Sequence, residues 1–346
     1  MMRIFFAVIL FPLSIFYGLI TWIRNLFFDA GILKSVSHKP YIISVGNLRA
    51  GGTGKTPFVE YLLRNMPSDR NPAVISRGYG RKTKGYRLIK STDTALNVGD
   101  EPLQMYKKFP QIPFAVSENR NIAVQNITEN NPQINTIILD DAFQHRYIKA
   151  DFSILLTPYI KPFFKDFVLP FGMLREYGSG YKRADLIVVT KCSAEIFNDI
   201  TLQKDYINKI KPLKHQSVLF SKINYKEPYR FSKPSIILSY SKDKSVILLS
   251  AIADNKHIYS HLIGKVKEVI PMTFPDHHNF TSSDIEAVKQ AVKKSNAVII
   301  TTEKDAVRLD KNTETVLETE IYVLGIEFLL NNNEFNFYKK WLYTNK

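Results

Sequence analysis

The segment ISVGNLRAGGTGKT, residues 43–56, has the composition of a phosphate-binding loop. Its glycines allow backbone N–H groups to turn toward a phosphate, and the N-terminus of the helix expected to follow adds positive charge. Lys55 is expected to contact the β- and γ-phosphates of ATP, and the Thr56 hydroxyl to bind Mg²⁺. The common pattern begins with glycine, whereas Arg49 stands at that position here, so the loop is a variant form. The expected nucleotide-binding residues are Gly51, Gly52, Thr53, Gly54, Lys55 and Thr56.

A pair of aspartates follows the apolar run TIIL, residues 136–139, which is typical of a buried strand. An acidic residue at the end of such a strand binds the metal in proteins with this kind of loop. Asp140 and Asp141 could divide two tasks, one binding Mg²⁺ or its water and the other orienting neighbouring groups. A solvated pair at a strand end is the alternative. Gln144 and His145 follow closely enough to line the same cleft.

A second acidic pair, Asp100 and Glu101, follows a glycine in the segment NVGDEP. Phosphoryl transfer to an alcohol needs a group that accepts the hydroxyl proton, and a carboxylate can do so. The same pair suits the start of a helix, with Asp100 as the N-cap and Glu101 in the first turn, so two interpretations stay open. The segment PDHHNF adds candidate metal ligands in Asp276, His277 and His278, but no further His or Cys stands at ligand spacing.

Charge and the remaining motifs narrow the class of protein. The formal net charge of +15 indicates an anionic partner without distinguishing nucleic acid, anionic lipid and a phosphorylated substrate. The segment VVTKCS resembles the guanine-binding tetrad of GTPases, but Ser193 occupies the place of its aspartate, and no D-x-x-G follows Asp140. The sequence has no RNA-binding or zinc pattern, so nucleic acid is not an expected partner. Intact Lys55 and Thr56 argue against a binding module with an inactive loop.

The elements that position these residues follow an alternating pattern of strands and helices. Apolar runs at 41–46, 73–78, 136–141, 152–157 and 186–190 predict buried strands, with helical patterns at 56–66 and 120–128 between some of them. This alternation predicts an α/β fold with a P-loop NTPase-like lobe, residues 31–225, built on a parallel-rich sheet.

A second, smaller α/β lobe is expected at residues 226–346 and includes a C-terminal helix. Its expected strands lie at 245–254, 265–272, 296–302 and 320–326, and its expected helices at 257–263 and 282–295. The polar segment 221–235, which contains two prolines, is the expected crossing between the lobes.

Residues 1–30 are expected to form an apolar, membrane-associated helix. The run 4–23 carries no charge, and roughly 20 residues of helix cross the core of a bilayer. A cleaved signal peptide is disfavoured because no small-residue cleavage site follows, and a buried core helix is the other alternative. Pro12 leaves open whether the helix spans the membrane or lies in its interface.

Two further features favour the cytoplasmic face of the inner membrane for the rest of the chain. Basic residues follow the apolar run, as they do on the cytoplasmic side of a membrane. These residues are Arg24, Lys34 and Lys39. The single cysteine, Cys192, cannot form an internal disulfide and fits a reducing compartment.

Taken together, these segments resemble the tetraacyldisaccharide 4'-kinases of lipid A biosynthesis. The resemblance covers almost the whole chain, because the segments occur in order after the apolar N-terminal run: SVGNLRAGGTGKTP, SRGYGR, GDEP, the arginine after VSEN, DDAFQH, LPFGMLRE, RADLIVVTK, FPDHHNF and TTEKDAVRL. It implies transfer of the γ-phosphate of ATP, with Mg²⁺, to the 4'-hydroxyl of a tetraacylated glucosamine disaccharide 1-phosphate. It also implies a P-loop lobe joined to a smaller α/β lobe that closes over the nucleotide. We expect a monomer whose partners are this glycolipid and the membrane surface.

The resemblance also implies roles for individual residues. Asp100 matches the proposed base, and His277 the histidine thought to assist it. The residues that match the metal side are Thr56, Asp140, Asp141, Gln144 and Glu176. Those that match the glycolipid or transition-state side are Arg77, Tyr79, Glu101, Arg120 and Arg175. Ala142 and Phe171 depart mildly from the family pattern, which affects local backbone shape and removes no catalytic group.

Overall fold

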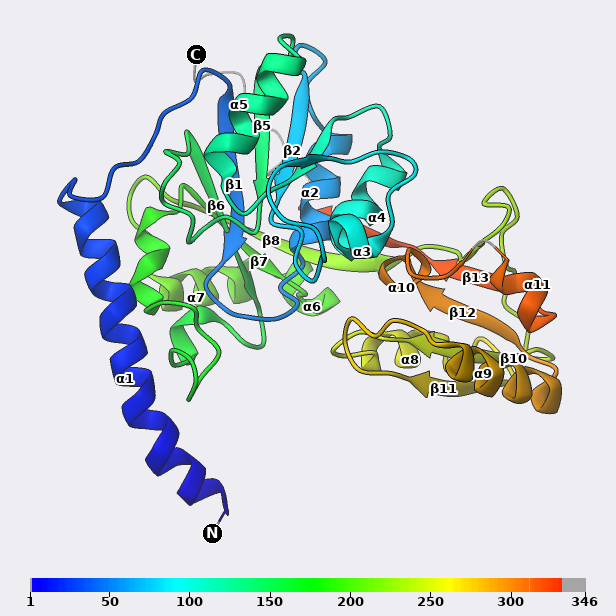
Figure 1. The fold of residues 1–346 in the computed structure, drawn as a ribbon. Coiled ribbons are helices and arrows are strands. Elements are labelled where there is room, and N and C mark those ends of the chain that lie inside the picture. Colours follow the sequence, from blue (N-terminus) through cyan, green and yellow to red (C-terminus); the bar gives the residue numbers. More distant parts are fainter. Residues whose placement is uncertain (1, 311, 332–346) are drawn as a thin grey trace.

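The computed structural model describes residues 2–310 and 312–331 of the chain. Two sheets, each covered by helices, form a larger and a smaller lobe, and a long N-terminal helix lies along the larger one (Figure 1). The predicted α/β fold, with a parallel-rich sheet in the larger lobe and a second, smaller α/β lobe, is confirmed.

Nine strands of the described chain form the sheet of the larger lobe. Their spatial order is β14-β8-β7-β6-β1-β5-β2-β4-β3, and the seven inner strands run parallel, while β14 and β3 pair antiparallel at the two edges. The strands are β1 (Tyr41–Asn47), β2 (Pro72–Ser76), β3 (Arg87–Leu88), β4 (Phe114–Val116), β5 (Thr136–Asp140), β6 (Phe152–Pro158), β7 (Leu186–Thr190), β8 (Ser217–Tyr225) and β14 (Ile326–Leu330).

Both faces of this sheet are buried, which explains the continuous apolar runs in the sequence. On β1, Ile42 and Ile43 are both fully buried but point to opposite faces, since side chains alternate along a strand. Ile43 packs with Phe58 of α2 (Lys55–Arg64), and Ile42 packs with Ile127 of α5 (Arg120–Asn130). The other helical segments of this lobe are α3 (Ala95–Val98), α4 (Asp100–Lys108), η1 (Phe163–Lys165), η2 (Gly178–Arg183), α6 (Ala194–Asn198) and α7 (Ile200–Ile210).

The smaller lobe is built on a second sheet, with the strand order β11-β10-β12-β13-β9. Its first four strands are parallel, and the short β9 pairs antiparallel with β13. The strands are β9 (Tyr229–Arg230), β10 (Ser245–Ser250), β11 (Glu268–Thr273), β12 (Val298–Thr302) and β13 (Ile321–Leu324). The helices are α8 (Lys256–Leu262), α9 (Ser282–Ser295), α10 (Glu303–Ala306) and α11 (Thr313–Leu317).

Within the described residues, the chain passes between the lobes twice. The first passage follows β8, which occupies the first part of the expected crossing at 221–235. The second passage leads from β13 to β14, and β14 pairs with β8 of the larger sheet. The division of the chain at residue 225 therefore stays a prediction, with the addition that residues 326–330 lie in the larger sheet. The expected C-terminal helix lies outside the described residues.

The N-terminal helix α1 (Met2–Asp29) contacts the larger lobe along one side only. Ser14 accepts a hydrogen bond from the Phe171 amide (2.7 Å) and donates to the Val168 carbonyl (3.0 Å), and the Tyr17 hydroxyl donates to the Arg175 carbonyl (2.9 Å). The segment Leu10–Asp29 is long and apolar enough to cross a membrane, as judged by length and composition alone.

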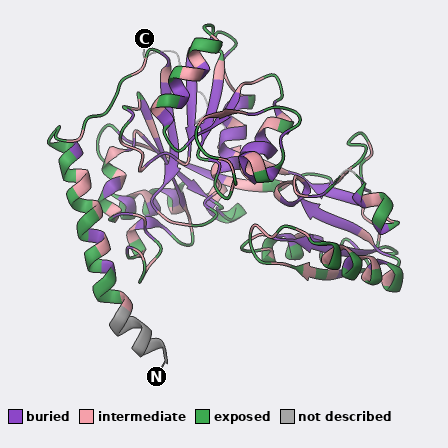
Figure 2. Cartoon of the chain, viewed as in Figure 1, coloured by how far each residue is buried: buried purple, intermediate pink, exposed green. Residues whose placement is uncertain are grey.

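The outward side of α1 is apolar and exposed (Figure 2). Because only 11% of Leu10–Asp29 is buried, the alternative of a core helix is wrong. Pro12 lies within the helix and does not end it. Between residues 10 and 29, the exposed large apolar residues of α1 are Phe11, Leu13, Ile15, Phe16, Leu19, Ile20, Trp22, Ile23, Leu26 and Phe27.

Candidate active site

The candidate site lies at the carboxyl edge of the larger sheet. Parallel strands end at the same edge, so the loops after β1, β2, β5 and β7 meet there. These loops carry the glycine-rich segment, Arg77, the aspartate pair and Lys191. The topology thus explains how residues far apart in the sequence come together.

The glycine-rich loop joins β1 to α2, as the sequence predicts. Gly51 and Gly54 adopt φ angles of 98° and 90°, a left-handed backbone that suits glycine. Asn47 fixes the loop from inside by donating to the Thr53 hydroxyl (2.7 Å). The Thr190 hydroxyl donates to the Thr53 carbonyl (2.8 Å) and is completely buried. Helix α2 then begins at Lys55, so its free N–H groups face the loop.

Lys55 and Arg175 bind the same carboxylate. The Lys55 ammonium lies 3.6 Å from Asp141 Oδ1, and Arg175 donates to both oxygens of Asp141 (2.7 and 3.1 Å). Burial raises the pKa of Asp141, but Lys55 and Arg175 outweigh it, and the net effect lowers this pKa. Asp141 therefore stays ionised between two cations.

Asp140 is a buried carboxylate with one unused oxygen. It is 1% exposed; its Oδ2 accepts from the Ser76 hydroxyl (3.1 Å), while its Oδ1 has no hydrogen-bond partner. Burial, followed by the nearby charges of Glu101 and Asp141, raises the pKa of Asp140 to about 7. A buried carboxylate oxygen without a partner is costly, and a hard cation such as Mg²⁺ binds carboxylate oxygen. Asp140 therefore fits a magnesium ligand through its Oδ1.

The Thr56 hydroxyl also fits a magnesium site. It sits at the start of α2 and donates to Glu101 Oε2 (2.9 Å), which shows that its oxygen faces the acidic groups. Mg²⁺ keeps several waters and uses only one or two carboxylates with substrate phosphates. No cluster of three or more His, Cys, Asp or Glu with metal-binding geometry occurs in residues 2–310 and 312–331, and a site of this sparse type does not need one.

Gln144 and Glu176 form a shared network beside the loop. Gln144 Nε2 donates to Glu176 Oε1 (3.0 Å) and to the Asn47 carbonyl (2.9 Å). Arg183 donates to Glu176 Oε1 (2.7 Å), and Asn25 of α1 donates to Oε2 (2.6 Å). Both predicted metal-side residues are thus satisfied by protein groups, and they connect the loop to α1.

A basic group lies next to the aspartate pair. Arg120, at the start of α5, is 3% exposed, and burial, followed by the nearby charge of Arg77, lowers its pKa to about 10. His145 lies among these arginines, and burial, then Arg120, Arg24 and Arg77, lower its pKa to about 4. A neutral imidazole beside several arginines leaves a cluster of positive charge in this region. The predicted Arg77 and Arg120 come together there, while Tyr79 is 75% exposed.

Asp100 begins α4 but does not cap it. Gly99 is the N-cap, and the Asp100 side chain instead contacts the smaller lobe, so the interpretation of Asp100 as an N-cap is wrong. His277 Nδ1 lies 2.7 Å from Asp100 Oδ2, and Arg308 Nη2 donates to the same oxygen (2.5 Å). The Tyr79 ring packs against the His277 ring, with centroids 5.6 Å apart. Asp276 contacts Lys304 and lies 3.8 Å from His277 Nε2, and His278 contacts Asp284. Within residues 2–310 and 312–331 these side chains belong to no group of three or more that could hold a metal ion.

Three residues at the site were not predicted to have a role. Arg308 and Lys304 belong to the segment TTEKDAVRL, and Lys304 Nζ lies 3.1 Å from His277 Nε2. Lys191, in the segment that resembles a GTPase tetrad, reaches the glycine-rich loop, where its ammonium lies 3.9 Å from the position of a Cβ on Gly52. In the sequence, these residues stood out only as members of segments that match a known motif. Their spacing did not imply a specific chemistry.

The arrangement separates two kinds of acidic group. Asp140 and Asp141 face the glycine-rich loop, while Asp100 binds no residue of that loop and contacts the smaller lobe. A glycine-rich loop between a strand and a helix, a buried carboxylate next to it and a separate carboxylate are the parts that a P-loop kinase requires.

Comparisons with known proteins agree with this class. The family described as tetraacyldisaccharide-1-P 4'-kinase, LpxK, matches residues 6–342. A tetraacyldisaccharide 4'-kinase from Flavobacterium psychrophilum is 43% identical over 339 residues, which are 96% of this chain and 94% of the relative. One from Bacteroides thetaiotaomicron is 38% identical over 345 residues, covering 94% of this chain and 89% of the relative. The chain belongs to the tetraacyldisaccharide 4'-kinase family, which confirms the resemblance.

A solved structure supports the same fold. It is the crystal structure of LpxK from Aquifex aeolicus, described as in complex with ATP, and its TM-score is 0.76 at 28% identity. The match covers 99% of both chains, so it includes the two lobes and the N-terminal helix.

Proposed function

We propose that this kinase transfers the γ-phosphate of ATP to the 4'-hydroxyl of a tetraacylated glucosamine disaccharide 1-phosphate, with Asp100 as the base. One observation carries the proposal. Glu101, next to Asp100 in the chain, accepts a hydrogen bond from the Thr56 hydroxyl (2.9 Å), so the candidate base lies beside the magnesium-binding end of the loop. The acceptor hydroxyl and the γ-phosphate can therefore meet between Asp100 and the loop.

The nucleotide half of the site uses the loop and its neighbours. The loop amides and Lys55 hold the phosphates of ATP, and Lys55 exchanges its contact with Asp141 for one with phosphate. Thr56 and Asp140 would hold Mg²⁺, which would neutralise negative charge on the phosphates. Asp141, kept ionised by Arg175, orients Lys55, while Gln144 and Glu176 support the loop from its other side.

The acceptor half of the site uses Asp100 and the basic group. Asp100 accepts the proton of the sugar hydroxyl as the phosphoryl group transfers in line. His277 supports the Asp100 carboxylate through its 2.7 Å contact. Arg77, Arg120 and Arg175 supply positive charge for substrate phosphate or for charge that develops during transfer, which suits the planar fork of arginine.

Helix α1 brings the enzyme to the cytoplasmic face of the inner membrane. Its outward side exposes a row of large apolar residues, and its inner side reaches the site through Asn25 and Glu176. An apolar side of this kind would enter the lipid and hold the acyl chains of the substrate near the kinase lobe.

A transfer assay with γ-labelled ATP tests the proposal. Four reactions are compared: the tetraacyl disaccharide 1-phosphate, a simple glucosamine disaccharide, RNA, and no acceptor. We expect label on the glycolipid at a rate far above the other three, and ATP to support it better than GTP because Ser193 lacks the carboxylate that binds guanine. Equal label release without acceptor would identify an ATPase and contradict the proposal.

A further inference from the structure

Arg308, a buried arginine of the smaller lobe, contacts the candidate base in the larger lobe. Its side chain is 1% exposed, and its Nη2 donates to Asp100 Oδ2 at 2.5 Å. The second amino group, Nη1, donates to Asp305 Oδ1 (3.1 Å) and to the His278 carbonyl (3.3 Å). One guanidinium therefore joins two carboxylates that belong to different lobes.

The smaller lobe holds this guanidinium in place. Asp305 is completely buried, and its Oδ2 accepts from the Thr302 hydroxyl (2.7 Å) and the Ala251 amide (3.1 Å). The planar guanidinium fork, anchored at Asp305, then has little freedom to move. The position of Nη2 is thus set by the smaller lobe, and Asp100 must come to it.

The contacts to Asp100 are one-sided. Both His277 and Arg308 bind Oδ2, whereas Oδ1 makes no hydrogen bond to any residue in the described part of the chain. The carboxylate is thereby oriented, with one oxygen occupied by the smaller lobe and the other left available.

We propose that Arg308 is a positioning residue that orients the Asp100 carboxylate so that Oδ1 receives the proton of the acceptor hydroxyl. This inference rests on the proposed role of Asp100 as the base. Because Arg308 and His277 both belong to the smaller lobe, the base is correctly oriented only when the lobes are together. Arg308 therefore makes proton acceptance depend on lobe closure, which limits transfer to water.

The charges around Asp100 are consistent with this role. Arg308 and His277 face Asp100 from the smaller lobe, and Glu101 follows it on α4. Lys304 contacts Nε2 of His277, the ring nitrogen that does not contact Asp100. Burial raises the pKa of Asp100, but His277 and Arg308 outweigh it, and the net effect lowers this pKa. Asp100 thus stays ionised and ready to accept a proton near neutral pH.

Four variants of the full-length enzyme test the inference: R308Q, R308K, D100N and the double variant D100N/R308Q. We expect R308Q to lower kcat by about 100-fold, the scale for a misplaced reacting group, with the KM for ATP unchanged. R308K should recover part of kcat, because lysine keeps the charge but cannot join both carboxylates. The acidic limb of the pH–rate profile should move to higher pH in R308Q, since the pKa of Asp100 rises when Arg308 is lost.

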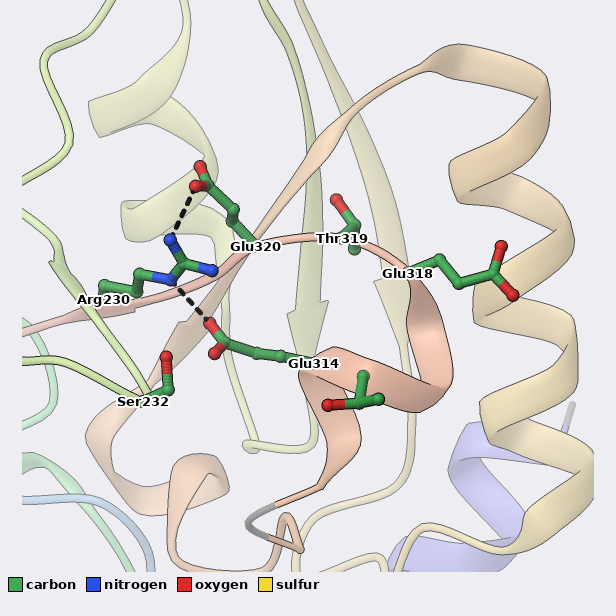
Figure 3. Close-up of a pocket in the computed structure, with 7 residues that line it drawn as sticks. Arg230, Ser232, Glu314, Glu318, Thr319 and Glu320 are labelled. Atoms are coloured by element: carbon green, nitrogen blue, oxygen red, sulfur yellow. Dashed lines mark hydrogen bonds and ion pairs between the residues drawn. The ribbon is translucent and has the colours of Figure 1, made fainter.

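The matched control is R230Q. Arg230 lies in the same lobe and also binds two carboxylates, Glu314 (3.4 Å) and Glu320 (2.8 Å), but at the β9 edge of the sheet (Figure 3). Among residues 2–310 and 312–331 it forms no ion pair or hydrogen bond with the candidate site. R230Q should keep the wild-type kcat, which separates general destabilisation of the lobe from an effect on Asp100.

The double variant shows whether Arg308 acts through Asp100. If it does, R308Q causes no further loss in the D100N background. An R308Q enzyme with wild-type kcat and pH profile, alongside an impaired D100N, would overturn the role of Arg308 alone. A D100N enzyme with wild-type turnover would instead overturn the base assigned in the proposed function. If R308Q does not fold, R308K provides the test of the role of Arg308, because wild-type kcat in that variant also overturns the inference.

Discussion

The ammonium group of Lys55 lies 3.6 Å from Oδ1 of Asp141, so the lysine of the glycine-rich loop and the second strand-end aspartate belong to one site. Arg175 binds the same carboxylate from the other side. Asp141 therefore holds Lys55 over the loop before nucleotide arrives. Lys55 is then close to the phosphates when ATP binds, and a charge that needs little rearrangement contributes more to catalysis.

Removal of the Lys55 charge should strongly reduce phosphoryl transfer. We expect K55M to lower kcat by about 100- to 1,000-fold, the scale for loss of one fixed group that stabilises the transition state. ATP binding should weaken as well, because Lys55 contacts the phosphates. Steady-state kinetics with the glycolipid acceptor and calorimetric ATP binding measure the two effects.

The control for this substitution is K204M, which removes an exposed lysine of α7. Both variants lose one positive charge, so an effect of the net charge alone would appear in both. Equal kcat values for K55M and the wild type would contradict the role of the loop.

The glycine-rich loop and the aspartate pair could be predicted because their chemistry is local. Lys55 and Thr56 are adjacent, and a strand before and a helix after them suffice to define the phosphate site. Asp140 could be predicted in the same way, because it ends a buried strand. The strands themselves were predictable because a sheet covered on both faces needs continuous apolar runs.

The role of Arg308 could not be predicted, because it depends on how the two lobes meet. Its partner Asp100 is 208 positions away, and no local pattern encodes that contact. The same reason explains the error over Asp100 as a helix cap: the local pattern favours a cap, but the contacts with His277 and Arg308 turn the side chain away. The return of β14 to the larger sheet is a further long-range pairing of this kind.

Gly99 should be more sensitive to substitution than Gly85, another glycine of the larger lobe with a positive φ. Its φ is 90°, and a Cβ would lie 2.9 Å from the Tyr79 carbonyl oxygen. We expect G99A to lose stability beyond the roughly 1–3 kcal/mol of backbone strain for a non-glycine residue at φ 90° and ψ 155°, and to lower kcat because Asp100 is the next residue. Thermal unfolding and kinetics measure both losses.

Gly85 provides the matched comparison in the same lobe. Its φ is 73°, but no atom lies within 4 Å of a Cβ placed there. G85A should therefore show the backbone strain without the collision, and its kcat should be that of the wild type. A G99A enzyme as stable and active as G85A would show that the close approach to Tyr79 does not matter.

His145 should make stability depend on pH below neutrality. Burial, followed by Arg120 and the other arginines, lowers its pKa from 6.5 to about 4 in the folded protein. Between these values the unfolded chain binds the proton and the folded chain does not, so the free energy of unfolding falls as pH falls from about 6.5 to about 4. This contribution is constant above about pH 6.5.

The substitution H145Q isolates this effect, because glutamine does not titrate. The difference in unfolding free energy between H145Q and the wild type should shift in favour of H145Q as pH decreases through that window, as measured by denaturant unfolding at several pH values. A difference that does not change with pH would mean that His145 titrates alike in both states.

The outward side of α1 should determine membrane binding. Phe16 and Ile20 are one helical turn apart, and each is 67% exposed, so substitution removes little packing inside the protein. In F16E/I20E, two buried apolar contacts with lipid would be replaced by charges, and each apolar side chain contributes about 1.5–3 kcal/mol on burial. We expect at least about a tenfold loss of binding to phosphatidylglycerol vesicles in a flotation assay, with ATP binding unchanged.

I200E, at an exposed residue of α7, is the control and should bind like the wild type. Undiminished vesicle binding by F16E/I20E would show that another surface contacts the membrane.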